Sequence, residues 1–120
     1  MHGKGYRVSG LAFDYDSAND ILYAYKDRTS AFTTVELGDF HLELAKDRSI
    51  VGVEVTDASD VLGEYGISRS DLERIERVAL RVGRQKNLLL VFLEIKVQQV
   101  EEEKLAAITL KDVSAALVSS

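Results

Sequence analysis

The sequence predicts an α+β domain in which an antiparallel β-meander packs on one main α-helix, with a further long C-terminal strand. Three observations support this prediction. Short alternating apolar runs, separated by turn residues, fill residues 8–56. Apolar residues then recur at helical spacing between residues 72 and 82. The apolar run LLLVFL at residues 88–93 is typical of a buried strand and is far too short to span a bilayer.

The composition is that of one globular domain. The chain has 120 residues, of which 46% are hydrophobic and 29% are charged, values that exclude a disordered chain. It contains no cysteine, which excludes disulfides, thiolate metal sites and a cysteine nucleophile. The start, MHGKGYRVSG, has no apolar h-region, so no secretory signal is expected. We therefore expect a single cytoplasmic domain over residues 1–120 with no membrane association.

Five short strands are expected between residues 8 and 56, namely VSGLAFD, ILYAYK, TTVEL, FHLELA and IVGVEV. The pair Gly38-Asp39 is typical of a two-residue hairpin turn, and the four residues KDRS form the next turn. These turns imply the cross-strand pairs Leu37 with Phe40, Val35 with Leu42, Thr33 with Leu44, Leu42 with Val53, Phe40 with Val55, and Leu44 with Val51. Both hairpins place Leu42 on the apolar face, and a one-residue slip would turn that whole set to solvent.

The acidic stretch FDYDSANDILYAYKD at residues 13–27 is either a metal-binding loop or a turn between strands. An EF-hand loop starting at Asp14 fails at three positions, which hold Ala18, Asn19 and Tyr25. The turn formers within residues 16–20 predict instead a connection between two strands, with a looser calcium site as the alternative. Pairing around that turn is expected to bring Phe13 near Tyr23 and Leu11 near Tyr25.

Residues 57–84 are predicted to be helical. The stretch DASDVLGEYG favours a short helix stopped by glycine, and SRSDLERIERVALRVG favours the main helix. Ser68 and Ser70 are both good N-caps for it, Ser70 and Glu73 have the spacing of a capping box, and Gly83 is a stop signal at its end. The apolar stripe of this helix consists of Leu72, Ile75, Ala79 and Val82.

Residues 87–120 form the predicted C-terminal strand region. NLLLVFLEIKVQQV predicts one long strand, whereas residues 105–118 are compatible with a strand or a short helix. The long strand is apolar on both faces, and one face, formed by Leu88, Leu90 and Phe92, has no evident cover within one chain. We therefore expect these three residues to form a homo-oligomer interface, unless residues 105–118 fold back over them.

Two segments of the chain resemble a known family. Tyr15-Asp16, Asp20 and Leu22-Tyr23 resemble the opening of the small-protein family catalogued as domain of unknown function 2283, and IVGVEVTDAS at residues 50–59 resembles its closing segment. The resemblance covers residues 12–65 and leaves the C-terminal half uncovered. It implies a small antiparallel sheet with a helix and no established enzymatic role. Some members are thought to sit beside toxin-like genes, which implies an antitoxin-like or other partner-binding role.

A ligand or metal site on the polar face of the meander is one functional hypothesis. If Leu42 points into the core, His41 points outward, with Glu36 and Glu54 as its cross-strand neighbours. A histidine between two carboxylates could hold a divalent metal, bind a small ligand or act as an acid/base pair. The alternative is a solvated face whose cross-strand pairs contribute about 0.2–1 kcal/mol each.

Nucleic-acid binding is a second functional hypothesis, and it depends on arginines at spacings of three, four and three. On a helix they would share one face, consisting of Arg74, Arg77, Arg81 and Arg84. The net charge of −5 argues against nucleic acid as the partner of the whole chain. The alternative is an exposed face paired with Glu73 and Glu76.

The function that we expect is a non-enzymatic protein-interaction module, either homo-oligomeric or bound to another protein. The sequence has no strained serine elbow, no credible catalytic triad and no phosphate-cradling glycine loop. We therefore predict no catalytic residue and no cofactor. Nucleic-acid binding and a weak metal or small-ligand site around His41 are the alternatives.

Overall fold

The computed structural model describes residues 7–85, 88–98 and 103–114, with side chains described at residues 10–83 and 91–98. Within these residues eight strands form one sheet in the order β3-β4-β5-β2-β1-β6-β7-β8, and all neighbours are antiparallel. The strands are β1 (Arg7–Asp16), β2 (Ile21–Tyr25), β3 (Thr33–Leu37), β4 (Phe40–Leu44), β5 (Ile50–Val55), β6 (Ile75–Gln85), β7 (Leu88–Gln98) and β8 (Glu103–Ser114).

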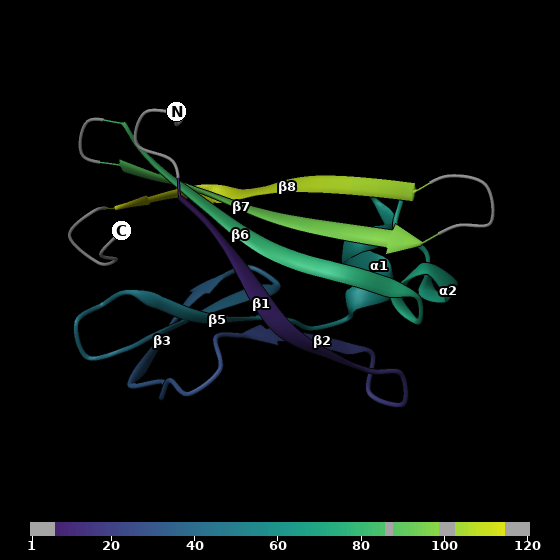
Figure 1. The fold of residues 1–120 in the computed structure, drawn as a ribbon, viewed down its shortest axis with the longest axis horizontal. Coiled ribbons are helices and arrows are strands. Elements are labelled where there is room, and N and C mark those ends of the chain that lie inside the picture. The colour runs from purple at the N-terminus through teal and green to yellow at the C-terminus, as the bar shows by residue number, and fades with distance from the viewer. Residues whose placement is uncertain (1–6, 86–87, 99–102, 115–120) are drawn as a thin grey trace.

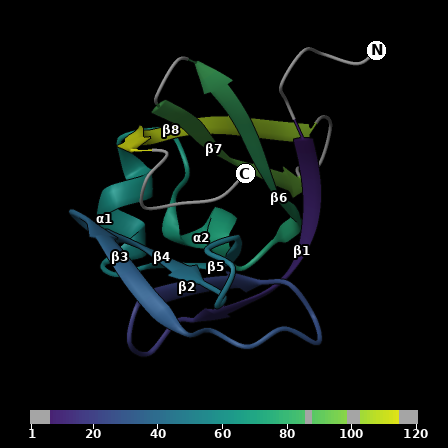
Figure 2. The same cartoon turned by 90° about the vertical axis from the view of Figure 1, so that its left-hand side faces the viewer.

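Strand β1 joins the two halves of the sheet. Its first half, through Leu11, pairs with β6, whereas its second half, from Ala12 to Asp16, pairs with β2. Because one strand changes neighbours along its length, the sheet curls instead of lying flat. Figure 1 shows β1 running diagonally between β6–β8 above and β2–β5 below, and Figure 2 shows the resulting curl end-on.

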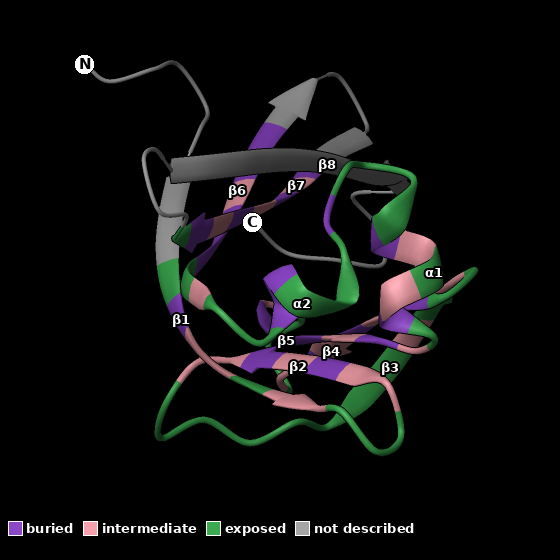
Figure 3. Ribbon diagram, turned by 90° about the vertical axis from the view of Figure 1, so that its right-hand side faces the viewer, coloured by how far each residue is buried: buried purple, intermediate pink, exposed green. Residues whose placement is uncertain are grey.

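Two short helices pack inside this curl. Helix α1 (Ala58–Gly63) lies beside the open side of the curl, and α2 (Arg69–Leu72) lies within it (Figure 2). Their segment buries four apolar side chains to 2% exposure or less, namely Ala58, Leu62, Ile67 and Leu72. These side chains belong to one core with the inward residues of β1, β2 and β4–β7, so the buried positions in Figure 3 line the inside of the curl. Each large apolar side chain buried there contributes about 1.5–3 kcal/mol.

The predicted main helix is wrong, and the fold class is corrected with it. Helix α2 ends at Leu72, and residues 75–85 form strand β6. In β6 the buried residues Val78, Leu80 and Val82 alternate with Arg77 and Arg81, which is the period of a strand. The molecule is therefore a curled antiparallel sheet with two short helices. Pairing with β1 on one edge and β7 on the other overrides the helical propensity of this segment.

The division of the chain changes accordingly, because the segment predicted as helical, residues 57–84, is helical only within residues 58–72. Glycine does follow the first short helix, since Gly66 adopts a positive φ of 85° shortly after α1. The capping box lies two residues earlier than predicted. Ser68 accepts a hydrogen bond from the Asp71 amide, and the Asp71 carboxylate accepts one from the Ser68 amide.

The register of the predicted meander is confirmed in its centre. Leu42 is fully buried and lies opposite Val35 and Val53, and Gly38 adopts the positive φ of 65° that the two-residue turn requires. Two pairings differ from the prediction by one residue. A bulge after Glu43 pairs Leu44 with Ile50 in place of Val51, and the first hairpin pairs Phe13 with Ala24 and Asp14 with Tyr23.

The C-terminal region is strand throughout its described part. The predicted long strand is β7, and its inward residues Val91, Leu93, Ile95 and Val97 are at most 1% exposed. Within residues 105–118, the described part is strand β8, which lies beside β7 in the sheet and does not fold over its outer face. Among the described residues, no helix is long and apolar enough to cross a lipid bilayer.

Candidate functional site

Five strands present two rows of side chains on the outer face of the meander. From β3 to β1, the first row consists of Glu36, His41, Glu54, Tyr23 and Asp14. The second row consists of Thr34, Glu43, Gly52, Tyr25 and Ala12. Both rows lie opposite the core because side chains alternate along a strand. We use the term carboxylate face for the acidic and ring-bearing members: Asp14, Tyr23, Tyr25, Glu36, His41, Glu43 and Glu54.

His41 lies opposite Glu36 on one side and Glu54 on the other, as predicted. Its Nδ1 is 3.2 Å from Oε1 of Glu54, and the two side chains are 26% and 36% exposed. A pair this exposed contributes at most about 1 kcal/mol. Among the described residues, no group of three or more histidines and carboxylates is placed to hold a metal ion. The predicted set Glu36, His41 and Glu54 therefore shares a row without a coordinating geometry.

Tyr23 bridges two strands that are not neighbours. It lies in β2, opposite Glu54 of β5, yet its hydroxyl donates a 2.5 Å hydrogen bond to Oε1 of Glu43 in β4. A hydroxyl bound to a carboxylate at this distance forms a strong, charge-assisted hydrogen bond. That bond, with burial and the charges of Glu43 and Glu54, raises the pKa of Tyr23 to about 12. The ring also stacks on Tyr25, with centroids 5.0 Å apart, so the phenol is held in place from two directions.

The bridge passes over Gly52, and this explains why a glycine stands in the middle of β5. Gly52 lies opposite both Glu43 and Tyr25 in the sheet. A Cβ atom at this position would lie 2.6 Å from Oε1 of Glu43 and 3.4 Å from the Ala24 carbonyl oxygen. The missing side chain thus leaves room for the carboxylate that accepts the Tyr23 hydrogen bond.

A second cluster joins the first hairpin to α1. The Asp20 carboxylate accepts hydrogen bonds from the Tyr15 hydroxyl at 2.6 Å, from the Ser59 hydroxyl at 2.7 Å and from the Ser59 amide at 3.0 Å. Its backbone carbonyl accepts one from the Ala58 amide, and Arg69 lies 3.6 Å away. Burial alone would raise the pKa of Asp20, but these hydrogen bonds and the Arg69 charge hold it below its usual value. Burial and the Asp20 hydrogen bond raise the pKa of Tyr15 to about 12.

The acidic opening loop is a turn, as predicted. The Asp16 carboxylate accepts hydrogen bonds from the Asn19 amide at 3.1 Å and from the Asn19 side chain at 2.8 Å, which lowers the pKa of Asp16. Asp20 ends the turn with a positive φ of 56°. The Asp16 carboxylate therefore accepts hydrogen bonds within the turn, and the Asp20 carboxylate accepts hydrogen bonds from Ser59 of α1.

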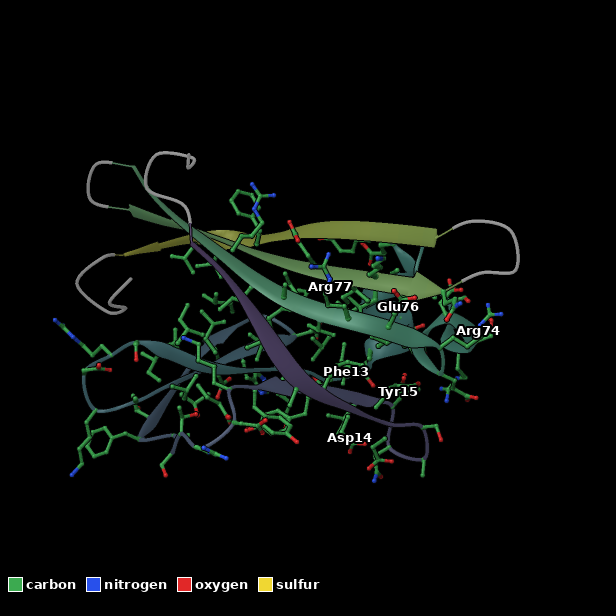
Figure 4. The ribbon with its side chains drawn as sticks, viewed as in Figure 1. Phe13, Asp14, Tyr15, Arg74, Glu76 and Arg77 are labelled. Carbon is green, nitrogen blue, oxygen red and sulfur yellow. The ribbon has the colours of Figure 1, made fainter. Side chains whose placement is uncertain are left out.

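The predicted arginine set does not share a helix face. Arg74 follows α2 and is 3.3 Å from Asp71, whereas Arg77 lies in β6 (Figure 4). Arg81 lies further along β6, on the same outer face as Arg77. Arg84 is in β6 opposite Leu89, and its side chain lies outside the described residues. The premise of the nucleic-acid hypothesis, four guanidinium groups in a helical row, is therefore wrong.

The outer face of β7 is partly described. Phe92 is half-buried, and the Arg81 guanidinium lies 5.5 Å from the centre of its ring. Arg81 also donates a 2.9 Å hydrogen bond to Glu94. The side chains of Leu88 and Leu90, the other members of the predicted oligomer interface, lie outside the described residues.

Sequence reasoning placed His41, Glu36 and Glu54 in one row but missed Tyr23, Glu43 and Asp20 as the best-connected polar groups. The signal for the first pair was Gly52, a glycine inside an apolar strand, which indicates a close approach by another group. For Asp20, the available signal in the sequence was Ser59, a hydroxyl-bearing residue at the start of the first short helix. Both contacts link residues far apart in the chain, so the sequence alone could not identify the partners.

Comparisons with known proteins found one family and one relative. Residues 12–59 match a family described as "Protein of unknown function (DUF2283)", which confirms the resemblance and leaves the C-terminal half uncovered. The match spans the whole carboxylate face and the Asp20 cluster as far as Ser59. A protein of Methanosarcina mazei described as "Putative hypoxanthine phosphoribosyltransferase" is 26% identical over 70 residues, 58% of this chain and 54% of that protein. The chain thus spans about half the length of this relative. No solved structure matches the chain.

Proposed function

We propose that this chain is a non-enzymatic recognition module whose carboxylate face binds a basic segment of a partner protein. One observation carries the proposal. Four carboxylates, Asp14, Glu36, Glu43 and Glu54, share one sheet face with a stacked tyrosine pair, and His41 is the one basic side chain in the two rows. Tyrosines are favoured in protein interfaces because they provide a large, rigid contact area.

The dimensions of this face suit an extended peptide or a neighbouring protein surface better than a small substrate. Five strands at a spacing of about 4.8 Å give the first row a length of roughly 19 Å. Side chains on a sheet form a broad surface, and its negative charge would accelerate encounter with a basic partner and disfavour an acidic one. An antitoxin-like role would be one form of such recognition, and the cytoplasm is the compartment in which we place it.

The name of the Methanosarcina relative suggests a different class of function, the transfer of a phosphoribosyl group to hypoxanthine. We do not extend that activity to this chain. A phosphorylated substrate would be repelled by the carboxylate face, and like charges brought together in an interface disfavour binding by several kcal/mol.

The decisive experiment measures the binding of a labelled basic peptide, with arginine at every second position, by fluorescence anisotropy. The face variant carries Glu36→Gln and Glu54→Gln. The matched control carries Asp60→Asn and Glu64→Gln, which remove the same number of negative charges from the helical segment. We expect the face variant to weaken binding about tenfold, a loss of about 1.4 kcal/mol, and the control to weaken it much less. Equal losses in both variants would mean that only the net charge of the molecule attracts the peptide.

Self-association is the second part of the proposal. Its support is the position of Phe92 on the outer face of β7, half-buried within one chain, where a second copy could complete its cover. We place the interface on the outer face of β7, in the strand segment that contains Leu88, Leu90 and Phe92.

A further inference from the structure

A pocket of about 410 Å³ opens where β1 and β6 separate. Strand β1 pairs with β6 only as far as Leu11, which lies opposite Val78, and then turns to β2. Strand β6 begins at Ile75, so residues 75–77 have no partner among the described strands on the β1 side. The volume is within the range of about 300–1,000 Å³ that is typical of small-molecule sites.

The lining of this pocket combines apolar and aromatic side chains with the polar residues Asp14, Ser17 and Glu73. Phe13 and Tyr15 of β1 line one side, and Leu72 and Ile75 line the other. Figure 4 shows Phe13 and Tyr15 on one side of β1, with Asp14 directed to the opposite side. The Tyr15 ring is held in place because its hydroxyl is hydrogen-bonded to Asp20 at 2.6 Å. The pocket therefore offers two ring surfaces, of which that of Tyr15 is held in place by the hydrogen bond to Asp20.

The charge of the pocket is negative. Glu73 lines it from the end of α2, and no described residue forms a hydrogen bond or ion pair with its carboxylate. The nearby guanidinium groups are engaged elsewhere: Arg74 lies 3.3 Å from Asp71, and Arg69 donates to the Ser17 carbonyl at 3.1 Å. The described lining contains no lysine, arginine or histidine. An incoming cation would meet a carboxylate that has no competing partner within the described part of the chain.

We propose that this pocket binds an organic ammonium ion carried on an aromatic or aliphatic stem. The stem packs against Phe13, Tyr15, Leu72 and Ile75, and the ammonium group faces Glu73. Aromatic rings attract cations through their electron-rich faces, which adds to the carboxylate attraction. Both a free organic amine and a lysine side chain carry an ammonium group on an apolar stem, so the ligand has two possible sources. The proposal rests on a different carboxylate from the carboxylate face, because the ammonium group faces Glu73, whereas Glu36, His41 and Glu54 lie on β3, β4 and β5. Asp14 is the one residue common to the pocket lining and the carboxylate face.

The test titrates the full chain with phenethylammonium and follows backbone amide and methyl signals by NMR. The matched probes are 2-phenylethanol, which lacks the charge, and 3-phenylpropionate, which reverses it. We expect phenethylammonium to bind with a dissociation constant on the order of 1 mM, as suits a small ligand, and to shift the signals of Leu72 and Ile75. We expect the alcohol to bind several-fold more weakly and the carboxylate not to bind. Equal binding of all three probes, or no shift at these residues, would overturn the proposal.

Glu73→Gln removes the charge and preserves the shape of the side chain, and Glu64→Gln, at the residue that follows α1, is the control outside the pocket. We expect the first variant to weaken phenethylammonium binding about tenfold and the second to leave it unchanged, with both still folded by their amide spectra. A tenfold loss in both, or in neither, would contradict the role of Glu73. A further probe, lysine with blocked termini, distinguishes a lysine side chain from a free amine as the ligand. Binding tighter than that of phenethylammonium identifies a peptide side chain, and weaker binding identifies a free amine.

Discussion

Gly52 has no side chain at a position where a Cβ atom would collide with the Glu43 carboxylate, at 2.6 Å. We expect Gly52→Ala to destabilise the protein by about 1–3 kcal/mol, because the added methyl forces Glu43 away from Tyr23. This loss would exceed the gain of about 0.4–1 kcal/mol from the stiffer unfolded chain. The shift of the urea unfolding midpoint, at unchanged slope, measures it.

Two companion variants test the cause of that loss. In a Glu43→Ala background the collision is gone, so Gly52→Ala should cost distinctly less than in the wild type. Gly63→Ala is the control, since a Cβ there would meet nothing within 4 Å and its helical position favours alanine. If Gly52→Ala costs the same with and without the Glu43 side chain, the Tyr23–Glu43 bridge is not the reason for the glycine.

The ionisation of Tyr23 makes the free energy of unfolding depend on pH in the alkaline range. Its pKa rises from an ordinary value of 10.0 to about 12 in the folded state, chiefly through the Glu43 hydrogen bond. A raised pKa contributes stability that is fully present below pH 10 and is lost as the pH rises from about 10 to 12. We expect Glu43→Gln to move the Tyr23 ionisation back toward 10, as followed by tyrosinate absorbance.

The tyrosine titration needs two controls. Tyr15 also ionises at about 12, so Tyr23→Phe identifies which transition belongs to Tyr23. Glu64→Gln changes the net charge equally from outside the carboxylate face and should leave the Tyr23 transition in place. A Tyr23 transition near 12 in the Glu43→Gln variant would show that the carboxylate is not its cause.

At the scale of secondary-structure elements, the decisive question is the state of residues 75–85. A strand buries Leu80 with Val78 and Val82, whereas the predicted helical stripe did not include Leu80 at all. We expect Leu80→Ala to cost about 2–5 kcal/mol, because it leaves a cavity between the sheet and the helices. Arg77→Ala, on the exposed side of the same strand, should stay within about 0.5 kcal/mol. Chemical denaturation of both variants decides the matter, and similar costs would contradict the strand alternation.

The elements also explain how the carboxylate face and the pocket meet at one strand. Strand β1 serves both, because Asp14 belongs to the row of the carboxylate face and lines the pocket together with its neighbours Phe13 and Tyr15. A strand directs successive side chains to opposite faces, so one short segment can contribute to two surfaces. The change of neighbour from β6 to β2 at Ala12 then opens the pocket on the inner side.

At the scale of the whole molecule, we expect self-association through the outer face of β7. One chain has a mass of 13.3 kDa, and sedimentation velocity at micromolar concentration should give about twice this value. Phe92→Ser should shift the population toward the monomer. Phe32→Ser is the matched control, because Phe32 is 66% exposed and lies before β3, away from β7. A monomeric wild type, or equal effects of both variants, would rule out this interface.

The sequence by itself determined the central meander and its turns. Gly38 and Asp39 form the hairpin, and strict alternation around Leu42 specifies which residues point inward, because a slip of one residue would expose the whole apolar set. The same local logic identified the turn at residues 16–20. These features depend on residues that are close together in the sequence, so short segments are enough to predict them. The row of Glu36, His41 and Glu54 follows from the same strand register.

Tertiary structure decided the rest. Residues 72–82 carry apolar side chains that are compatible with helix and strand, and pairing with β1 and β7 selected the strand by satisfying both of its edges. The Tyr23–Glu43 bridge, the Asp20–Ser59 contact and the pocket between β1 and α2 join residues that are 20 or more positions apart. Such contacts exist only once the strands have paired and the helices have packed on them, because the partners come from segments that are distant in the sequence.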